Sequence, residues 1–143
     1  MRVVRAWLAV TLVLAACQPV PPPKRSVAEP APVQPALVHG RAFFLERMLL
    51  APGATLDVLL IGEQGDAAPA TIAQAHFVDL HGPPYDFELP YDPARIDAGT
   101  HYSLRANLRN AEGHLEFATD ARVPVTPGAA QRVEFRLVRA GAN

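Results

Sequence analysis

Cysteine, net charge and long apolar runs are all scarce in this 143-residue chain. The one cysteine, Cys17, excludes a disulfide within the chain. A formal net charge of −1 provides no electrostatic basis for binding nucleic acid or an anionic membrane surface, so we expect no nucleic-acid partner. The length suits one domain, and a hydrophobic content of 50% is enough for a packed core.

The N-terminal apolar stretch is too short to cross a membrane. Trp7–Ala16 follows Arg2 and Arg5 and covers ten residues, whereas a spanning helix needs about 20. A positively charged start, a compact apolar stretch and small residues at its end are typical of a secretory signal peptide. We therefore place a signal peptide at residues 1–16.

The end of this stretch resembles the lipobox of bacterial lipoproteins, with Leu14, Ala15, Ala16 and Cys17 in the four positions. The resemblance implies cleavage between Ala16 and Cys17, a diacylglyceryl group on the cysteine sulfur and a third chain, such as palmitate, on its amine. Two chains already suffice for stable anchoring, since each buried methylene contributes about 0.8 kcal/mol. Gln18 does not resemble the aspartate that retains lipoproteins in the inner membrane, so we expect an outer-membrane anchor facing the periplasm. The alternative is an ordinary signal peptide with a chance cysteine.

Proline is concentrated in one stretch near the N-terminus. Seven of the 15 prolines lie between Pro19 and Pro35. Proline fixes φ and removes a backbone donor, which favours extended polyproline II structure with a rise of about 3.1 Å per residue. We therefore expect residues 17–36 to form the lipidated cysteine and a proline-rich linker. Without residues 1–16 the chain keeps 11 basic and 14 acidic residues, a net charge of −3.

Short alternating segments separated by turns begin at Leu37. Alternation with a period of two and one polar face is typical of antiparallel strands with one face in water. About seven such strands in roughly 100 residues predict a single all-β domain over residues 37–140, an Ig-like antiparallel β-sandwich. The predicted strands are Val38–Phe44, Thr55–Ile61, Ala70–Val78, Tyr85–Leu89, His101–Arg109, His114–Ala118 and Gln131–Val138. The alanines of Ala70–Val78 would also suit a helix.

The alternation assigns side chains to the two faces of each strand. In His101–Arg109, Ser103 is predicted on the solvent face, opposite the inward side chains of Tyr102, Leu104, Ala106 and Leu108. A hairpin turn at Asn110–Gly113 precedes Leu115 and Phe117, both predicted to point inward. The stretch from Asp97 to Tyr102 resembles the tyrosine corner of Ig-like sandwiches, in which the hydroxyl bonds to upstream backbone. The alternative is a simple core role for Tyr102.

The sequence YDFELPYDPARID, from Tyr85 to Asp97, is the most distinctive segment. Pro90 is expected to end its strand, because proline cannot donate to the ladder. Asp92 is expected to accept a backbone hydrogen bond in a turn, and Arg95 to pair with Glu88, Asp92 or Asp97.

Two interpretations of the turn in this segment are open. Tyr91, Asp92 and Arg95 would form a binding loop in the functional interpretation. In the other, which we favour, the same residues form a structural crossover between the sheets.

The sequence offers no recognisable catalytic set. Cys17 is expected to be lipidated, and neither Ser26 nor Ser103 lies in a nucleophile elbow. Asp86 and its acidic neighbours could serve glycoside hydrolysis, but alternating strand faces produce such pairs routinely. Five histidines, expected on exposed strands or loops, lack the spacing of zinc ligands: His39, His76, His81, His101 and His114. We expect a non-enzymatic protein without a metal or cofactor.

Three patterns carry a family resemblance. The first includes Val38, Gly40, Glu46-Arg47, Leu50, Pro52-Gly53-Ala54, Leu56, Val58 and Leu60; the second is Tyr85–Asp97; the third is Tyr102, Leu104 and Ala106. Together with the lipobox they resemble the YbaY-type lipoproteins, within the type III secretion lipoprotein chaperone, or YscW-like pilotin, family. The resemblance spans almost all of Val38 to Val138 and implies a small periplasmic β-sandwich on a lipid anchor.

In the pilotin branch such a domain binds the C-terminal segment of a secretin and carries it to the outer membrane. The resemblance thus implies a protein-binding module whose partners are the membrane, through the anchor, and an outer-membrane protein such as a secretin. An exposed sheet edge or inter-sheet groove would capture an extended or helical peptide. The alternatives are an envelope structural or stress-protective lipoprotein without a secretin client, and a sandwich that binds a glycan or lipid.

Overall fold

The computed structural model describes residues 34–130 and 132–141. The predicted signal peptide, the lipobox with Cys17 and most of the predicted linker lie outside these residues. Within them, no helix is long and apolar enough to span a membrane.

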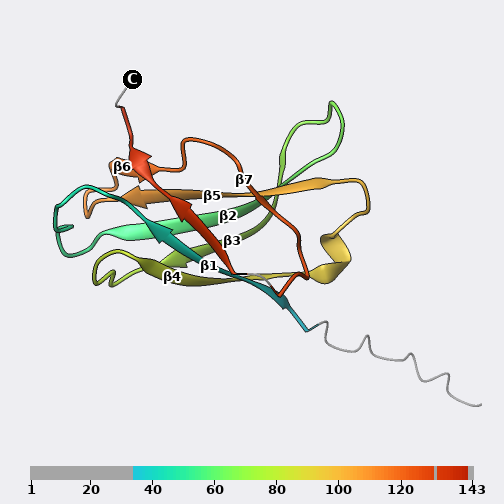
Figure 1. The fold of residues 1–143 in the computed structure, drawn as a ribbon, viewed down its shortest axis with the longest axis horizontal. Helices are drawn as coiled ribbons and strands as arrows, with labels where there is room; N and C mark the ends of the chain where they lie inside the picture. The colour runs from blue at the N-terminus through green and yellow to red at the C-terminus, as the bar shows by residue number, and fades with distance from the viewer. Residues whose placement is uncertain (1–33, 131, 142–143) are drawn as a thin grey trace, which may run out of the picture. The chain divides into compact units, whose positions relative to one another are not determined.

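Nine strands in two sheets make up the domain (Figure 1), so the all-β sandwich is confirmed, with two strands more than the seven predicted. One sheet has three strands in the order β4-β1-β8, and the other has six, in the order β3-β2-β5-β6-β9 with β7 also paired to β5. The elements are β1 Ala36–Phe43, β2 Thr55–Glu63, β3 Ala70–Phe77, β4 Tyr85–Tyr91, the 3-10 helix η1 Pro93–Arg95, β5 His101–Arg109, β6 Leu115–Ala118, β7 Val123–Val125, β8 Val133–Arg136 and β9 Val138–Arg139. Ala70–Phe77 is a strand rather than a helix.

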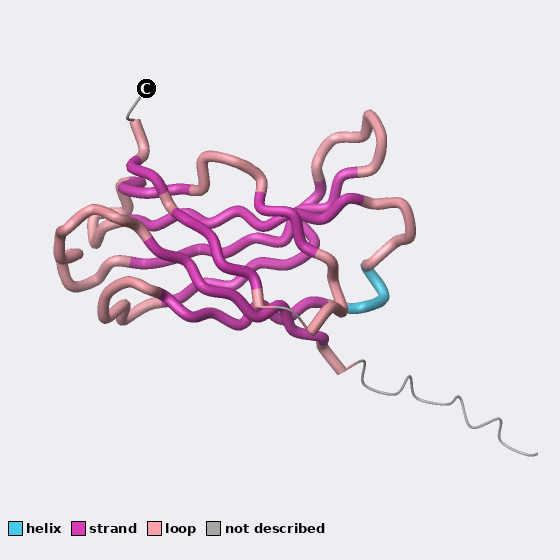
Figure 2. The backbone as a smooth tube through the Cα atoms, in the orientation of Figure 1, coloured by secondary structure: helices cyan, strands magenta, loops and turns pink. Residues whose placement is uncertain are grey.

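The predicted last strand, Gln131–Val138, is two strands that belong to different sheets (Figure 2). β8 pairs with β1 and β9 pairs with β6. Leu137 lies between them, with its side chain buried and its N–H donating to the carbonyl oxygen of Phe43 at 2.7 Å. β8 runs parallel to β1, which corrects the wholly antiparallel prediction. Alternation within one segment reports its faces and not the direction of its neighbour.

The core between the sheets is filled by inward side chains of both. The largest of these with less than 2% exposure are Phe117, Leu56, Leu60, Leu89, Leu104, Leu108, Leu137 and Val58. Gly40 lies opposite Phe87 in the β1–β4 register, and a Cβ built on it would lie 2.1 Å from the Phe87 ring. A glycine is therefore needed at this position for the ring to pack across β1.

Two predicted faces are wrong. Leu115 is 39% exposed because the pairing of β5 with β6 shifts between Leu108 and Arg109, so that Leu108 faces Phe117 but Arg109 faces Leu115. Such a bulge adds a residue and turns the following side chain to the other face. Ser103 is 7% exposed and not solvated, since the register places it between Ile61 of β2 and Pro124 of β7.

Pro90 does not end its strand, contrary to the prediction. β4 continues to Tyr91, and Pro90 pairs with Leu37. β4 is an edge strand, and among residues 34–130 and 132–141 it has one ladder partner, β1. A proline is tolerated there because no second strand needs its missing N–H.

Candidate binding site

The predicted binding loop is built by contacts within the fold. Tyr91 is buried at the end of β4. Asp92 caps η1, accepting a hydrogen bond from the Ala94 N–H at 2.9 Å, as predicted. Arg95 does not pair with the predicted acids. Its guanidinium donates to the backbone carbonyls of Ile72 and of Thr71, the latter at 2.9 Å. These contacts favour the interpretation of this segment as a crossover between the sheets.

The tyrosine corner is confirmed. The Tyr102 hydroxyl accepts a hydrogen bond from the Asp97 N–H at 2.7 Å and lies 3.5 Å from the Asp97 carbonyl oxygen. It fixes the chain between η1 and the first residues of β5. Like the Arg95 contacts, this bond stabilises the fold and does not create a surface for a partner.

Four edge strands, β4, β7, β9 and β3, carry features that disfavour the addition of another strand. Unpaired edges invite pairing, and proteins block them with proline, bulges, charges or very short strands. β4 contains Pro90, β7 contains Pro124, and β9 has two residues. β3 pairs with β2 through a bulge next to Ile61, and Arg95 covers two of its carbonyls.

Three exposed apolar side chains lie on the β1–β2 loop (residues 44–54) and the β3–β4 loop (residues 78–84), at an end of the sandwich that we call the loop end (left in Figure 1). Leu45 is 67% exposed and Leu49 is 93% exposed on the first loop, and Val78 is 57% exposed on the second. Met48 packs against the core, and its sulfur lies 3.2 Å from the Arg139 guanidinium of β9. The β1–β2 loop is thus held in place while two of its leucines face solvent.

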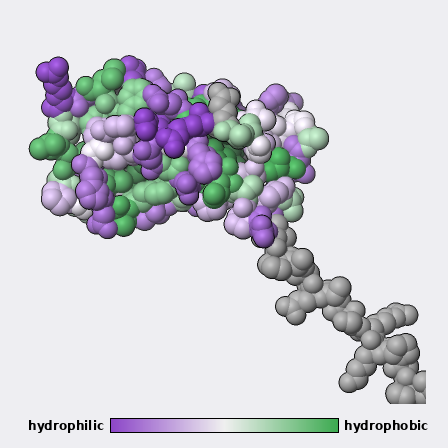
Figure 3. Space-filling view, turned by 60° about the horizontal axis from the view of Figure 1, so that its bottom comes forward, coloured by the Kyte–Doolittle hydropathy of each residue, from purple (hydrophilic) through white to green (hydrophobic). Residues whose placement is uncertain are grey.

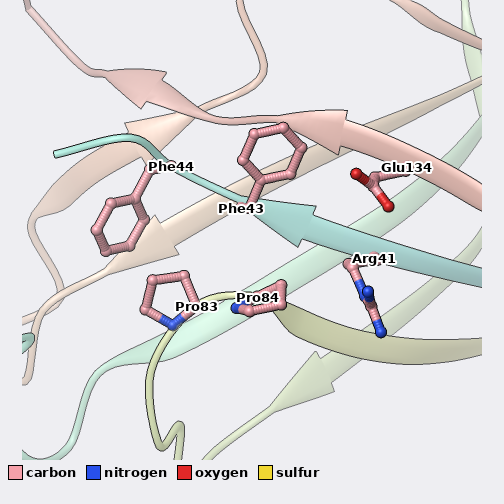
Figure 4. Close-up of a pocket in the computed structure, with 6 residues that line it drawn as sticks. All are labelled: Arg41, Phe43, Phe44, Pro83, Pro84 and Glu134. Carbon is pink, nitrogen blue, oxygen red and sulfur yellow. The ribbon is translucent and has the colours of Figure 1, made fainter.

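An open groove of about 310 Å³ adjoins the loop end. Its walls are Phe43, the last residue of β1, and the adjoining Phe44 on one side and Pro83 and Pro84 on the other (Figure 4). Phe44 is buried and stacks on Phe117, with ring centroids 4.5 Å apart. Phe43 is half-buried, because it points to the outer face of its sheet. We call this the aromatic groove; Arg41 and Glu134 complete its lining.

Charged side chains lie in the rows beside the aromatic groove. Asp86 Oδ1 is 2.9 Å from Arg41 Nε and 3.2 Å from an Arg132 nitrogen. The hydrogen bond from Arg41 lowers the pKa of Asp86, and the same bond raises the pKa of Arg41. Arg136 lies opposite Phe43, and Glu134 lies opposite Arg41. Three guanidinium groups and two carboxylates thus occupy neighbouring positions on and beside β1, β4 and β8. Figure 3 shows hydrophilic residues (purple) among hydrophobic ones (green) on the side of the molecule that it displays.

Tyr85 lies at the inner side of the loop end with an unsatisfied hydroxyl. The residue is 5% exposed, and its hydroxyl has no hydrogen-bond partner among the described residues. Burial raises the pKa of Tyr85 to about 12. Tyr85 and Leu56 also line a second open cleft, of about 270 Å³, beneath the β3–β4 loop.

The histidines are all exposed, as predicted. His76 Nδ1 lies 2.7 Å from Asp57 Oδ1, and His39 Nδ1 lies 3.4 Å from Glu88 Oε1. Over residues 34–130 and 132–141, no three His, Cys, Asp or Glu side chains are grouped as metal ligands. The chemistry that the surface offers is recognition by apolar contact and ion pairing.

The loop end and the aromatic groove were missed in the sequence analysis. The signal was present in the run Phe43-Phe44-Leu45 and the nearby Met48-Leu49-Leu50, which continue an apolar pattern past the end of a strand. A loop with several large apolar residues leaves some of them exposed unless the fold covers each one. Here Met48 and Leu50 are covered, and Leu45 and Leu49 are not.

Comparison with known proteins gives a consistent result. The family model for the type III secretion system lipoprotein chaperone (YscW) matches residues 33–137. Among solved structures, the chain is similar to an alternative pilotin from the type II secretion system of Vibrio cholerae. The identity is 29% and the TM-score is 0.67, over 74% of this chain and 97% of that chain. No curated protein matches the sequence.

Proposed function

The chain belongs to the family of type III secretion system lipoprotein chaperones, and from this premise we propose that it is a non-enzymatic pilot protein for a secretin. In this role the sandwich domain binds the C-terminal segment of the secretin, and a lipid on Cys17 directs the complex to the outer membrane. The partner would be the secretin of a secretion system in the same cell.

The family match over residues 33–137 is the observation that carries this proposal. It covers the strands from β1 to β8, and the pilotin of known structure is matched over nearly its full length. The domain also has an exposed apolar loop end next to an open groove. A surface of this kind can bind the apolar side chains of a peptide.

A small-ligand role has less support. Ligand sites are concave and enclose most of the ligand. The space between the two sheets is instead filled by side chains with almost no exposure, among them Phe117, Leu60 and Leu104. The clefts that line the loop end are open to solvent.

The test is a cross-linking pull-down from native outer membranes, with the full lipidated chain as bait. We expect one secretin to be recovered in near-equal amount, and we expect the secretin to reach the outer membrane poorly in a deletion strain. Recovery of bulk lipoproteins and cell-wall fragments alone, with normal secretin localisation in the deletion strain, would contradict the proposal and favour an envelope structural role.

A further inference from the structure

We infer that β8 is a dimerisation edge, along which a second copy of this chain adds its own β8 in the antiparallel direction. The pairing places Glu134 of each copy opposite Arg136 of the other, and it joins the two three-stranded sheets into one continuous sheet. The inference does not rest on the proposed function, because the occupant of the edge is the chain itself.

The edge of β8 is free and open. In the described part of the chain, β8 has one ladder partner, β1, in a register without a bulge. β8 contains no proline, unlike the edge strands β4 and β7. An open cleft of about 300 Å³ lies between β7 and β8, lined by Val123 and Val125 on one side and by Val133 and Glu134 on the other. An uncovered edge of this kind is a template for another strand.

The backbone groups on the free edge belong to Glu134 and Arg136. The Leu137 N–H donates to the Phe43 carbonyl oxygen of β1 at 2.7 Å. Successive residues of a strand point their N–H and C=O groups to opposite sides, so those of Phe135 also point to β1 and those of Glu134 and Arg136 point away from it. An antiparallel second β8 that bonds to these groups places Glu134 opposite Glu134, Arg136 opposite Arg136, or Glu134 opposite Arg136.

Charge selects the last of these registers. Unlike charges directly opposite each other stabilise an antiparallel strand pair, and like charges destabilise it. The two-fold symmetry of such a dimer repeats the pair of Glu134 with Arg136 on both sides of the axis, where Phe135 of one copy meets Phe135 of the other. Glu134 and Arg136 are both exposed, and neither forms an ion pair with another described residue. The second copy therefore supplies each of them with a partner.

The same pairing extends a row of charges that already crosses the three-stranded sheet. Asp86 of β4 lies opposite Arg41 of β1, and Arg41 lies opposite Glu134 of β8. Arg136 of the second copy continues this row, so that acidic and basic side chains alternate across the junction. A strand with charges of one sign would repel its own copy, whereas β8 carries one of each sign and attracts it in this register.

The short ladder determines where the dimer forms. β8 has four residues, and a ladder of this length buries far less than the about 800 Å² per partner of a standard interface. The lipid anchor predicted at Cys17 would confine both copies to one membrane and raise their effective concentration. We therefore expect the dimer in the membrane and not in dilute solution.

The first test is disulfide formation between two differently tagged full-length copies in native membranes, one carrying Glu134→Cys and the other Arg136→Cys. Opposed residues of a hydrogen-bonded pair lie about 5.5 Å apart at Cα, which suits a disulfide. We expect a mixed disulfide between the two copies. Neither variant alone should form one, because like positions are out of register and beyond the limit of about 7 Å. The chain with neither substitution controls for Cys17, and Arg105→Cys, exposed on β5 of the other sheet, should form no disulfide with either variant.

The second test exchanges the charges in the full lipidated chain in liposomes, with association followed by energy transfer between donor-labelled and acceptor-labelled copies. Arg136→Glu alone and Glu134→Arg alone should each self-associate at least about tenfold more weakly than the native chain. An equal mixture of the two variants should restore association, because unlike charges are again opposite each other. That restoration also shows that both variants fold. Arg105→Glu is the matched control and should associate like the native chain.

Several results would overturn the inference. They are a disulfide of Glu134→Cys with itself, a disulfide of Arg136→Cys with itself, no disulfide in any combination, and energy transfer that is indifferent to both charge reversals. None of these results bears on the pilot role, which the pull-down tests separately.

Discussion

Replacing Tyr85 with phenylalanine should stabilise the domain, although the change removes a polar group from a native core. The Tyr85 hydroxyl is buried and has no hydrogen-bond partner among the described residues. A buried unsatisfied group destabilises by about 1–3 kcal/mol relative to its solvated state. Phenylalanine removes that term and loses only the few contacts of one oxygen atom. The net gain in the free energy of unfolding should be about 0.5–2 kcal/mol.

The matched control is the same substitution at a satisfied hydroxyl. Tyr102→Phe removes the oxygen that accepts from the Asp97 N–H at 2.7 Å. This change should lower the free energy of unfolding by about 1 kcal/mol. The two variants differ from the native chain by one oxygen each, and they should shift stability in opposite directions.

Thermal and urea unfolding, followed by circular dichroism, measure both changes. For a domain of this size each kcal/mol shifts the Tm by about 4–8 °C. The pKa of Tyr85 is raised to about 12 from 10 in the unfolded chain. The contribution of Tyr85 protonation to the free energy of unfolding is therefore fully present below pH 10. It is lost as the pH rises toward 12, because the unfolded chain releases the proton at a lower pH than the folded chain. Tyr85→Phe should abolish that loss. A Tyr85→Phe variant less stable than the native chain would refute the reasoning and indicate a satisfied hydroxyl.

Three further variants test the anchor and the core. Cys17→Ala should leave an uncleaved, unacylated precursor, and incorporation of radiolabelled palmitate into that variant would rule out Cys17 as the anchor. Leu104→Asp places a charge at a site with 0% exposure and should unfold the domain; an unchanged Tm would contradict the assigned inner face. Gly40→Ala puts a Cβ 2.1 Å from the Phe87 ring and should lower stability by about 1–3 kcal/mol. An unchanged free energy of unfolding in Gly40→Ala would remove the steric explanation.

Most of the fold could be predicted from periodicity because each long strand has one buried and one wet face. The alternation in His101–Arg109 predicted the burial of Leu104, Ala106 and Leu108, and it failed at Ser103. Burial of an outward side chain depends on what lies over it, and Pro124 belongs to a strand of three residues that has no recognisable pattern.

The alternation of apolar and polar residues did not predict the bulge in β6 or the change of sheet between β8 and β9. Leu115 has the sequence features of a core residue, but the register shift after Leu108 turns it outward. Gln131–Val138 alternates without interruption, and nothing in that alternation marks Leu137 as the point where the chain changes sheets. Both features depend on partners far away in the sequence.

The site was the least predictable part. The distinctive motif from Tyr91 to Arg95 suggested a binding loop. In the structure, Asp92 and Arg95 bond to backbone within the domain and stabilise the crossover. Phe43 and Pro84 are far apart in sequence and line one groove only because the β1–β4 register brings Ala42 opposite Tyr85.

The two consecutive strands β8 and β9, which belong to different sheets, have a mechanical consequence. A tensile force applied to the residues before β1 acts along the axis of that strand, which is bonded to β4 on one side and to β8 on the other. Force along the axis loads both ladders in shear, so that many hydrogen bonds resist together instead of breaking one at a time. Because β8 continues through Leu137 into β9, the load passes from the three-stranded sheet into the six-stranded one. A domain tethered at this point would transmit a pull from its tether to both layers at once.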